Sequence, residues 1–322
     1  MPLVCNYYLT YRCNARCTFC DLWQHENRDL ADASDVLDNL KTLRAAGVRI
    51  VDFTGGEPLM HPELPMFLRV ARKHGLMTTV TTNGILYPKL AAELHGLISI
   101  LHISIDSMDP IVHDKLRGIS CYDLAIKSVE TALSSGEKPD LLFTAGRDNY
   151  KDVVPLSGYA RSKNLVLIVN PMFEVNGGEG ALGHDELVEL ERLCRKPNVY
   201  LNGGVIRIML EGGNNTLKPR CRAVSSSIVI SPDNELLLPC FHRAQGAVSI
   251  NGSLNRALAS AERMKWLHLQ GREDICRNCT INCYLAPSLP YRLDRYFASF
   301  IPWGVKYLYY RNFRLKPAES NA

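Results

Sequence analysis

The sequence predicts an α/β protein: a partial (β/α)6 barrel of parallel strands, followed by a small cysteine-rich α+β extension. Two observations lead to this fold class. In the first half, six short apolar runs alternate with helical segments of roughly ten to fifteen residues, the pattern of repeated right-handed βαβ units. The second half changes character near Gly203, where β-rich runs and closely spaced cysteines replace the alternation. We therefore expect three units, at residues 1–202, 203–290 and 291–322.

Each predicted element of the barrel has a local reason. The strands are runs rich in aliphatic, β-branched or aromatic residues, at 3–9, 50–53, 77–81, 100–105, 141–144 and 165–169. The helices between them are predicted at 34–46, 65–74, 87–95, 122–134 and 153–162. Ser34 is a candidate N-cap for the first helix, and Gly47, Gly75 and Gly136 follow the ends of three helices, where glycine commonly terminates them.

Three cysteines follow the first predicted strand. Cys13, Cys17 and Cys20 have C-x3-C-x2-C spacing. A [4Fe–4S] cluster normally takes four thiolates, so three close thiolates leave one iron open to another ligand. For this run alone the alternative is a zinc site, although zinc usually takes four ligands from two paired groups.

A glycine-rich turn follows the second predicted strand, in the run Thr54-Gly55-Gly56-Glu57-Pro58. Two glycines allow the backbone to approach a ligand closely, and the Glu57 carboxylate can accept hydrogen bonds from an ammonium group. Alone, this segment would equally suit a tight turn. It lies at the carboxyl end of a strand, as do the cysteines, Asn83 and Asp106, and barrels bind their ligands at that end.

Together, the three-cysteine run and the Gly-Gly-Glu-Pro segment resemble the signature of the radical S-adenosylmethionine (SAM) superfamily. The resemblance implies that Cys13, Cys17 and Cys20 hold a [4Fe–4S] cluster whose open iron binds SAM. It also implies that the Gly55-Gly56-Glu57 segment holds the SAM amine, with Asn83 as a further cofactor-binding candidate.

A second stretch extends this resemblance. In a large radical SAM subgroup, a Ser-x-Asp run leads into HD-x-x-RG, as Ser104-Ile105-Asp106 leads into residues 113–118 here. The similarity implies SAM contacts for Ser104, Asp106 and Arg117, and an arginine fork suits the SAM carboxylate. The alternative is that Asp114 and Arg117 pair on a helix surface at i, i+3.

The second half holds five patterned cysteines: Cys221, Cys240, Cys276, Cys279 and Cys283. They flank a predicted hairpin at 225–240 and a predicted helix at 252–269. This order resembles the SPASM or shortened twitch extension of radical SAM enzymes, which holds auxiliary [4Fe–4S] clusters. The full SPASM pattern has more cysteines, so five thiols fit one auxiliary cluster with one thiol left over. Cys221 and Cys240 with two of the last three are favoured, and a structural zinc site is the alternative.

The remaining three cysteines, Cys5, Cys121 and Cys194, have no patterned partners and are expected to be small buried hydrophobes. Hydrophobic content of 46% and charged content of 22% are ordinary globular values. A net charge of +4 gives no support for a nucleic-acid partner. The sequence has neither an uninterrupted apolar stretch long enough for a membrane span nor a secretion signal at its start, so a cytoplasmic location is expected.

The tail is unusual because residues 301–316 mix five aromatic residues with four cations. It could lie on an anionic membrane surface as a peripheral contact, cover a flat apolar substrate as a lid, or pack on the barrel as a terminal helix.

For function, the family resemblance implies an oxidoreductase. Reduced ferredoxin or flavodoxin would supply one electron, SAM would be cleaved to a 5′-deoxyadenosyl radical, and that radical would attack an unactivated C–H bond of a small molecule. A short enzyme with one extension resembles the radical SAM hydroxylases of green sulfur bacteria that convert the C-7 methyl of bacteriochlorophyllide c or d towards the formyl group of bacteriochlorophyllide e. A chlorin is therefore the specific substrate candidate. The alternatives are a dehydrogenase or maturase for another small molecule, peptide or lipid precursor, and a non-enzymatic iron–sulfur or zinc scaffold.

Overall fold

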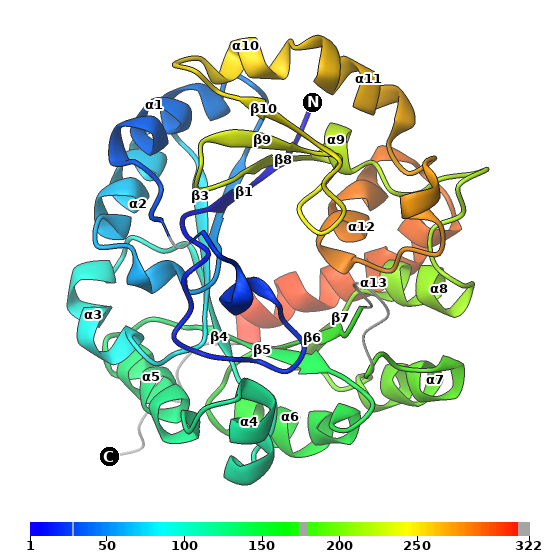
Figure 1. The fold of residues 1–322 in the computed structure, drawn as a ribbon. Coiled ribbons are helices and arrows are strands. Elements are labelled where there is room, and N and C mark those ends of the chain that lie inside the picture. The colour runs from blue at the N-terminus through cyan, green and yellow to red at the C-terminus, as the bar shows by residue number, and fades with distance from the viewer. Residues whose placement is uncertain (28, 174–179, 315–322) are drawn as a thin grey trace.

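A curved ten-stranded sheet forms the centre of the computed structural model, which describes all residues except 28, 174–179 and 315–322 (Figure 1). The strand order is β10-β9-β8-β1-β2-β3-β4-β5-β6-β7. From β8 through β1 to β7 all neighbours run parallel, whereas β8, β9 and β10 form antiparallel pairs. The strands are β1 (Val4–Tyr8), β2 (Ile50–Thr54), β3 (Met77–Thr82), β4 (Ile100–Ser104), β5 (Asp140–Ala145), β6 (Leu167–Pro171), β7 (Val199–Leu201), β8 (Ser227–Ile230), β9 (Glu235–Leu238) and β10 (Gly246–Ser249).

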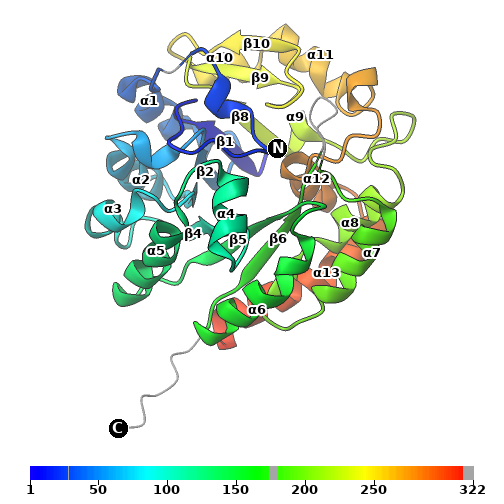
Figure 2. The same ribbon diagram turned by 60° about the horizontal axis from the view of Figure 1, so that its bottom comes forward.

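The helices cover the outer face of this sheet, and Figure 2 shows α6 beside β6 and α7 beside α8. In the barrel they are α1 (Ala33–Leu43), α2 (Leu64–Lys73), α3 (Tyr87–Leu94), α4 (Pro110–Arg117), α5 (Tyr122–Ser134), α6 (Val153–Ser162), α7 (His184–Leu193) and α8 (Gly203–Leu210). Beyond it lie α9 (Ala223–Ser226), α10 (Leu254–Leu258), α11 (Ala261–Leu269), α12 (Asn282–Ser288) and α13 (Arg295–Tyr309). Short helical turns are η1 (Leu22–Gln24), η2 (Pro58–Met60), η3 (Tyr150–Asp152), η4 (Asp274–Cys276), η5 (Leu289–Tyr291) and η6 (Tyr310–Arg314).

Alternation along the strands separates the core from the barrel interior. Tyr7 and Val51 are buried against the helices, whereas their neighbours Asn6 and Asp52 are half-buried and face the other way. Asp52 accepts a hydrogen bond from Thr79 Oγ1 at 2.5 Å, and burial raises the pKa of this carboxyl to about 6. The interior of the barrel is therefore polar, unlike the apolar layer between sheet and helices.

The predicted α/β fold is confirmed, with differences at its edges. The sheet has a seventh parallel strand, β7, which is too short to leave an apolar run in the sequence. The predicted hairpin forms as β8 and β9, and β8 pairs in parallel with β1, so the sheet is continuous from barrel to hairpin. The single helix predicted at 252–269 is instead two helices, because Ser260 caps the start of α11 by accepting a hydrogen bond from Arg263 N. The first helix is capped by Asp32 rather than Ser34.

The C-terminal helix α13 lies beside β7 and α8 (Figure 1) and contacts the amino ends of the strands. Tyr307 Oη donates to the carboxylate of Asp140, the first residue of β5, at 2.7 Å, and Arg311 forms an ion pair with the same carboxylate. The cysteine loop that follows β1 is at the opposite, carboxyl end of the barrel. For the described part of the tail, the lid interpretation is therefore wrong and the terminal-helix interpretation is confirmed.

The outward face of α13 carries exposed apolar side chains, among them Val305 and Leu308. No described helix is long and apolar enough to cross a membrane. Peripheral membrane contact through this face stays a prediction.

Candidate cofactor site

One pocket gathers most of the predicted cofactor residues at the carboxyl ends of β1 to β4. Its lining includes Cys13, Cys17, Cys20, Gly55, Gly56, Glu57, Asn83, Ser104 and Arg117.

Burial raises the pKa of Cys13 to about 11 and of Cys20 to about 12, so both are protonated at neutral pH without a metal. Binding iron at these thiols must therefore release protons. Three thiols with no fourth cysteine in the lining suit a cluster with one open iron.

The two glycines of the turn after β2 hold the cysteine loop against the sheet. A Cβ on Gly55 would lie 2.2 Å from Thr10 O, and one on Gly56 would lie 2.1 Å from Arg12 O. Gly56 N donates to Thr10 O, and Glu57 N donates to Arg12 O, each at 2.8 Å. The close approach that requires glycine is thus to the backbone of the cysteine loop, in addition to the pocket that both glycines line.

The Glu57 carboxylate joins the ends of β2 and β3. It is 1% exposed and accepts hydrogen bonds from Thr82 Oγ1 at 2.8 Å, Asn83 N at 2.9 Å and Leu59 N at 3.1 Å. Burial raises its pKa to about 7 despite these donors. The Asn83 side chain continues towards the cysteines, donating to Asn14 Oδ1 at 2.7 Å and lying 3.9 Å from Cys13 Sγ.

The end of α4 anchors the other side of the cysteine loop. Arg16 N donates to Arg117 O at 3.0 Å, and Thr18 N donates to Leu116 O at 2.9 Å. Gly118 ends α4 with φ +67°, and a Cβ there would lie 2.2 Å from Arg16 O. Sequence reasoning did not identify Gly118 as a site residue, although the HD-x-x-RG spacing contains it.

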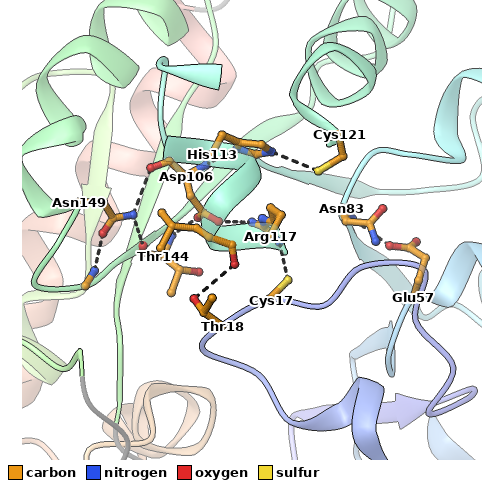
Figure 3. A network of polar contacts seen from close by, with 12 residues as sticks. Cys17, Thr18, Glu57, Asn83, Asp106, His113, Arg117, Cys121, Thr144 and Asn149 are labelled. Atoms are coloured by element: carbon orange, nitrogen blue, oxygen red, sulfur yellow. Dashed lines mark hydrogen bonds and ion pairs between the residues drawn. The ribbon is translucent and has the colours of Figure 1, made fainter. Parts of the chain in front are cut away.

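Arg117 lies between Asp106 and the cysteine loop (Figure 3). Its Nη2 is 2.7 Å from Asp106 Oδ2, its Nη1 is 3.8 Å from Cys17 Sγ, and its guanidinium is 5.6 Å from the centre of the Phe19 ring. Its Nε is buried and has no hydrogen-bond partner in the described part of the chain. A buried arginine with one free donor, lining a pocket of thiols, can bind an anionic group of a cofactor.

Asp106 does not line the pocket, unlike the other predicted SAM-binding residues. It is fully buried, pairs with Arg117 and accepts a hydrogen bond from Thr144 N at 3.0 Å. Its position is that of a residue that orients Arg117.

The predicted alternative pairing of Asp114 with Arg117 is wrong. Asp114 Oδ1 accepts hydrogen bonds from Cys121 N at 2.9 Å and Tyr122 N at 2.8 Å, so it caps the start of α5. His113 lies behind the site, where its Nδ1 accepts from Asp106 N at 3.2 Å (Figure 3).

A second group of cysteines surrounds a separate small cavity. Cys221, Cys240, Cys276 and Cys279 line it, and Cys283 does not. Arg243 also lines this cavity, and its Nε is buried with no hydrogen-bond partner among the described atoms. Four thiols beside a cation fit a cluster, because a [4Fe–4S] group held by four thiolates is anionic.

A buried asparagine, Asn214, ties the two halves of this cysteine group together. Its Nδ2 donates to Gly271 O at 2.8 Å and to Cys276 O at 3.1 Å, while its Oδ1 accepts from Cys221 N at 3.1 Å. No sequence signal distinguishes Asn214 from other loop asparagines. The other three cysteines, Cys5, Cys121 and Cys194, are buried as predicted.

Aromatic rings connect the two cysteine groups. Phe241, directly after Cys240, stacks on Tyr8 with ring centres 4.0 Å apart and planes at 10°. It also lies 6.1 Å from the ring of Tyr11, two residues before Cys13. These ring contacts join the segment after Cys240 to the segment before Cys13.

Comparisons with known proteins agree with this geometry. Residues 7–154 match the family model described as the radical SAM superfamily. A probable GTP 3′,8-cyclase of Sulfolobus acidocaldarius is 23% identical over 278 residues, which cover 80% of this chain and 87% of that protein. Fe-coproporphyrin III synthase of Methanosarcina barkeri is 28% identical over 153 residues, which cover 45% of this chain and 37% of that protein.

Two solved structures resemble the fold. Streptococcus suis SuiB bound to S-adenosylmethionine has a TM-score of 0.69 at 19% identity, over 92% of this chain and 76% of that chain. Native anSMEcpe with bound AdoMet has a TM-score of 0.64 at 15% identity, over 98% of both chains. These likenesses support the mostly parallel α/β architecture.

Proposed function

We propose that this chain cleaves SAM reductively and oxidises an unactivated C–H bond of a small molecule, because residues 7–154 match the radical SAM family model. The cofactors of such a domain are a [4Fe–4S] cluster and SAM. When bound, they supply a 5′-deoxyadenosyl radical, which the protein must orient and protect from quenching. The observation that carries the proposal is the single pocket shared by three cysteines, Glu57 and Arg117.

Different residues of that pocket bind the cluster, the carboxylate of SAM and the ammonium group of SAM. Cys13, Cys17 and Cys20 hold the cluster. The Arg117 guanidinium, oriented by Asp106, pairs with the carboxylate of SAM, since its Nε is free and its charge is buried. The Glu57 carboxylate accepts hydrogen bonds from the ammonium group of SAM, and the positive charge of that group lowers the pKa of Glu57 when SAM binds.

We further propose that Cys221, Cys240, Cys276 and Cys279 hold an auxiliary [4Fe–4S] cluster and that Cys283 is the thiol left over. The shared cavity and the buried cation Arg243 support this set. Two four-iron clusters give about eight irons per chain. A C240A variant should retain about four irons, while C283A should retain about eight. A wild-type protein with about four irons and one zinc would favour the structural zinc site.

The substrate proposed first is a chlorin, with hydroxylation of the C-7 methyl of bacteriochlorophyllide c or d towards the formyl group of bacteriochlorophyllide e. The ring of Phe241 is only partly buried and stacks on Tyr8, and an aromatic side chain of this kind suits packing against a planar ring. The similarity to Fe-coproporphyrin III synthase, named for a related macrocycle, supports this choice. Electrons would come from reduced ferredoxin or flavodoxin.

The second candidate substrate is GTP. It is favoured by the similarity to a probable GTP 3′,8-cyclase, which extends over 80% of this chain. This candidate would make the reaction a cyclisation rather than a hydroxylation.

One anaerobic assay tests both levels of the proposal. The iron-loaded protein is mixed with SAM and dithionite, alone or with bacteriochlorophyllide c or GTP, and 5′-deoxyadenosine and the products are measured by mass. The C17A variant should form no 5′-deoxyadenosine. The matched control C194A removes a buried cysteine far from the pocket and should remain active. If wild type and C17A both fail to cleave SAM while wild type is loaded with iron, the enzymatic proposal is wrong. If SAM is cleaved and only GTP is converted, the chlorin proposal is wrong.

A further inference from the structure

A second concave site, which we call the basic pocket, has Cys221 in its lining. Its volume is about 470 Å³, within the usual range of roughly 300–1,000 Å³ for small-molecule sites. Five fixed cations line it, namely Lys218, Arg220, Arg222, Arg272 and Arg292. The lining also contains His268 and no carboxylate.

Arg220 forms the buried part of this pocket. Its side chain is 5% exposed; Nη1 is 3.2 Å from Asp294 Oδ2 and Nη2 donates to Leu289 O at 3.3 Å. Its Nε is buried and has no hydrogen-bond partner in the described part of the chain. A buried guanidinium with a free donor indicates a place for an acceptor group.

The cations at the rim of the basic pocket also have few carboxylate partners among the described residues. Lys218, Arg222 and Arg272 are exposed, and none of them forms an ion pair with a described carboxylate. Arg292 shares Asp294 with Arg220, at 3.7 Å. Like charges gathered around one concavity repel each other, and a multiply charged anion placed among them relieves that repulsion.

We propose that the basic pocket binds a small anion with two or more phosphate groups, either a free oligophosphate or the phosphate chain of a nucleotide. Arginine forks match phosphate oxygens in pairs, and the pocket offers four arginines and one lysine. A single carboxylate would leave most of these cations unpaired. The site is distinct from the SAM pocket, because the two linings share no residue.

The test is calorimetric titration of the iron-loaded protein with inorganic triphosphate at low salt. The double variant K218A/R272A removes two exposed rim cations and should weaken binding at least tenfold. The matched control R69A/K73A removes two exposed cations from α2 and should bind within about twofold of wild type. Iron content and SAM cleavage should be unchanged in both variants, so failure of the proposed catalytic function would leave this result interpretable.

The proposal is overturned if wild type shows no binding up to about 1 mM triphosphate, or if K218A/R272A binds as tightly as wild type. Titration with ATP and GTP distinguishes the sources of phosphate. Equal affinity for all three would identify a free oligophosphate, and tighter binding of one nucleotide, lost in K218A/R272A, would identify the nucleotide.

Discussion

Replacing Gly56 by alanine should detach the cysteine loop from the sheet. The new Cβ would lie 2.1 Å from Arg12 O and 2.5 Å from Arg12 C, both backbone atoms. Backbone cannot rotate away as a side chain can, so the loop has to move by about 1 Å to reach an ordinary contact distance. That movement breaks the hydrogen bonds that join the two segments, from Gly56 N to Thr10 O and from Glu57 N to Arg12 O.

The expected cost is the sum of two effects. Each lost backbone hydrogen bond contributes about 1 kcal/mol, and overpacking adds about 1–3 kcal/mol. The free energy of unfolding should therefore fall by roughly 3–5 kcal/mol in G56A. Because the displaced segment carries Cys13, the variant should also lose iron at the first cluster while retaining it at the second.

Urea denaturation and iron analysis of the anaerobic protein measure both effects. The matched control is G158A, since Gly158 lies inside α6 with no heavy atom within 4 Å of an added Cβ. Alanine there should stabilise the helix by about 0.5–1 kcal/mol and leave the iron content unchanged. The reasoning is refuted if G56A unfolds like wild type and keeps all its iron.

Three further changes test other contacts. R117A should lower the free energy of unfolding by about 3–5 kcal/mol, because it leaves the buried Asp106 charge unpaired. In urea denaturation, the double variant R117A/D106N should recover part of that loss. If it recovers none, the pairing of Arg117 with Asp106 does not stabilise the fold. R311A should cost a similar amount by stranding Asp140, so an unchanged midpoint would show that α13 does not depend on this pair. Burial lowers the pKa of His102 to about 4, and the charge of Arg311 has a smaller effect in the same direction. Between about pH 4 and 6.5 the unfolded chain therefore binds one more proton at this residue than the folded chain does. The free energy of unfolding should fall as the pH falls through that window. In H102N, the slope of the free energy of unfolding against pH should decrease in this window by at most about 1.4 kcal/mol per pH unit. An unchanged slope would mean that His102 is not buried as a neutral ring.

The barrel could be predicted because its strands and helices differ in local pattern. Apolar runs such as 50–53 and glycines after helices mark βαβ units without knowledge of distant contacts. The short strand β7 and the parallel pairing of β8 with β1 could not be predicted in this way, since both depend on partners far along the chain.

The candidate site shows the same limit. The spacing of Cys13, Cys17 and Cys20 and the position of Glu57 were sufficient to predict one shared pocket. The place of Asp106 behind Arg117 depends on how the segment between β4 and α4 contacts β5, and so could not be read from spacing. Among the last cysteines, Cys283 lies in the first turn of α12 and does not line the cavity, and no sequence pattern specifies which side of that helix faces the cavity.

The pairing of β1 with both β2 and β8 has a consequence for how the protein matures. During synthesis β2 emerges soon after β1, but β8 emerges only when most of the chain has been made. Until then β1 is an edge strand with unpaired backbone groups, which is a site for wrong association. The loop with Cys13, Cys17 and Cys20 continues directly from this strand, so its final shape depends on a contact of high sequence separation, which forms slowly. Iron loading is therefore expected to follow completion of the chain, and a product that ends before β8 should aggregate rather than acquire a cluster.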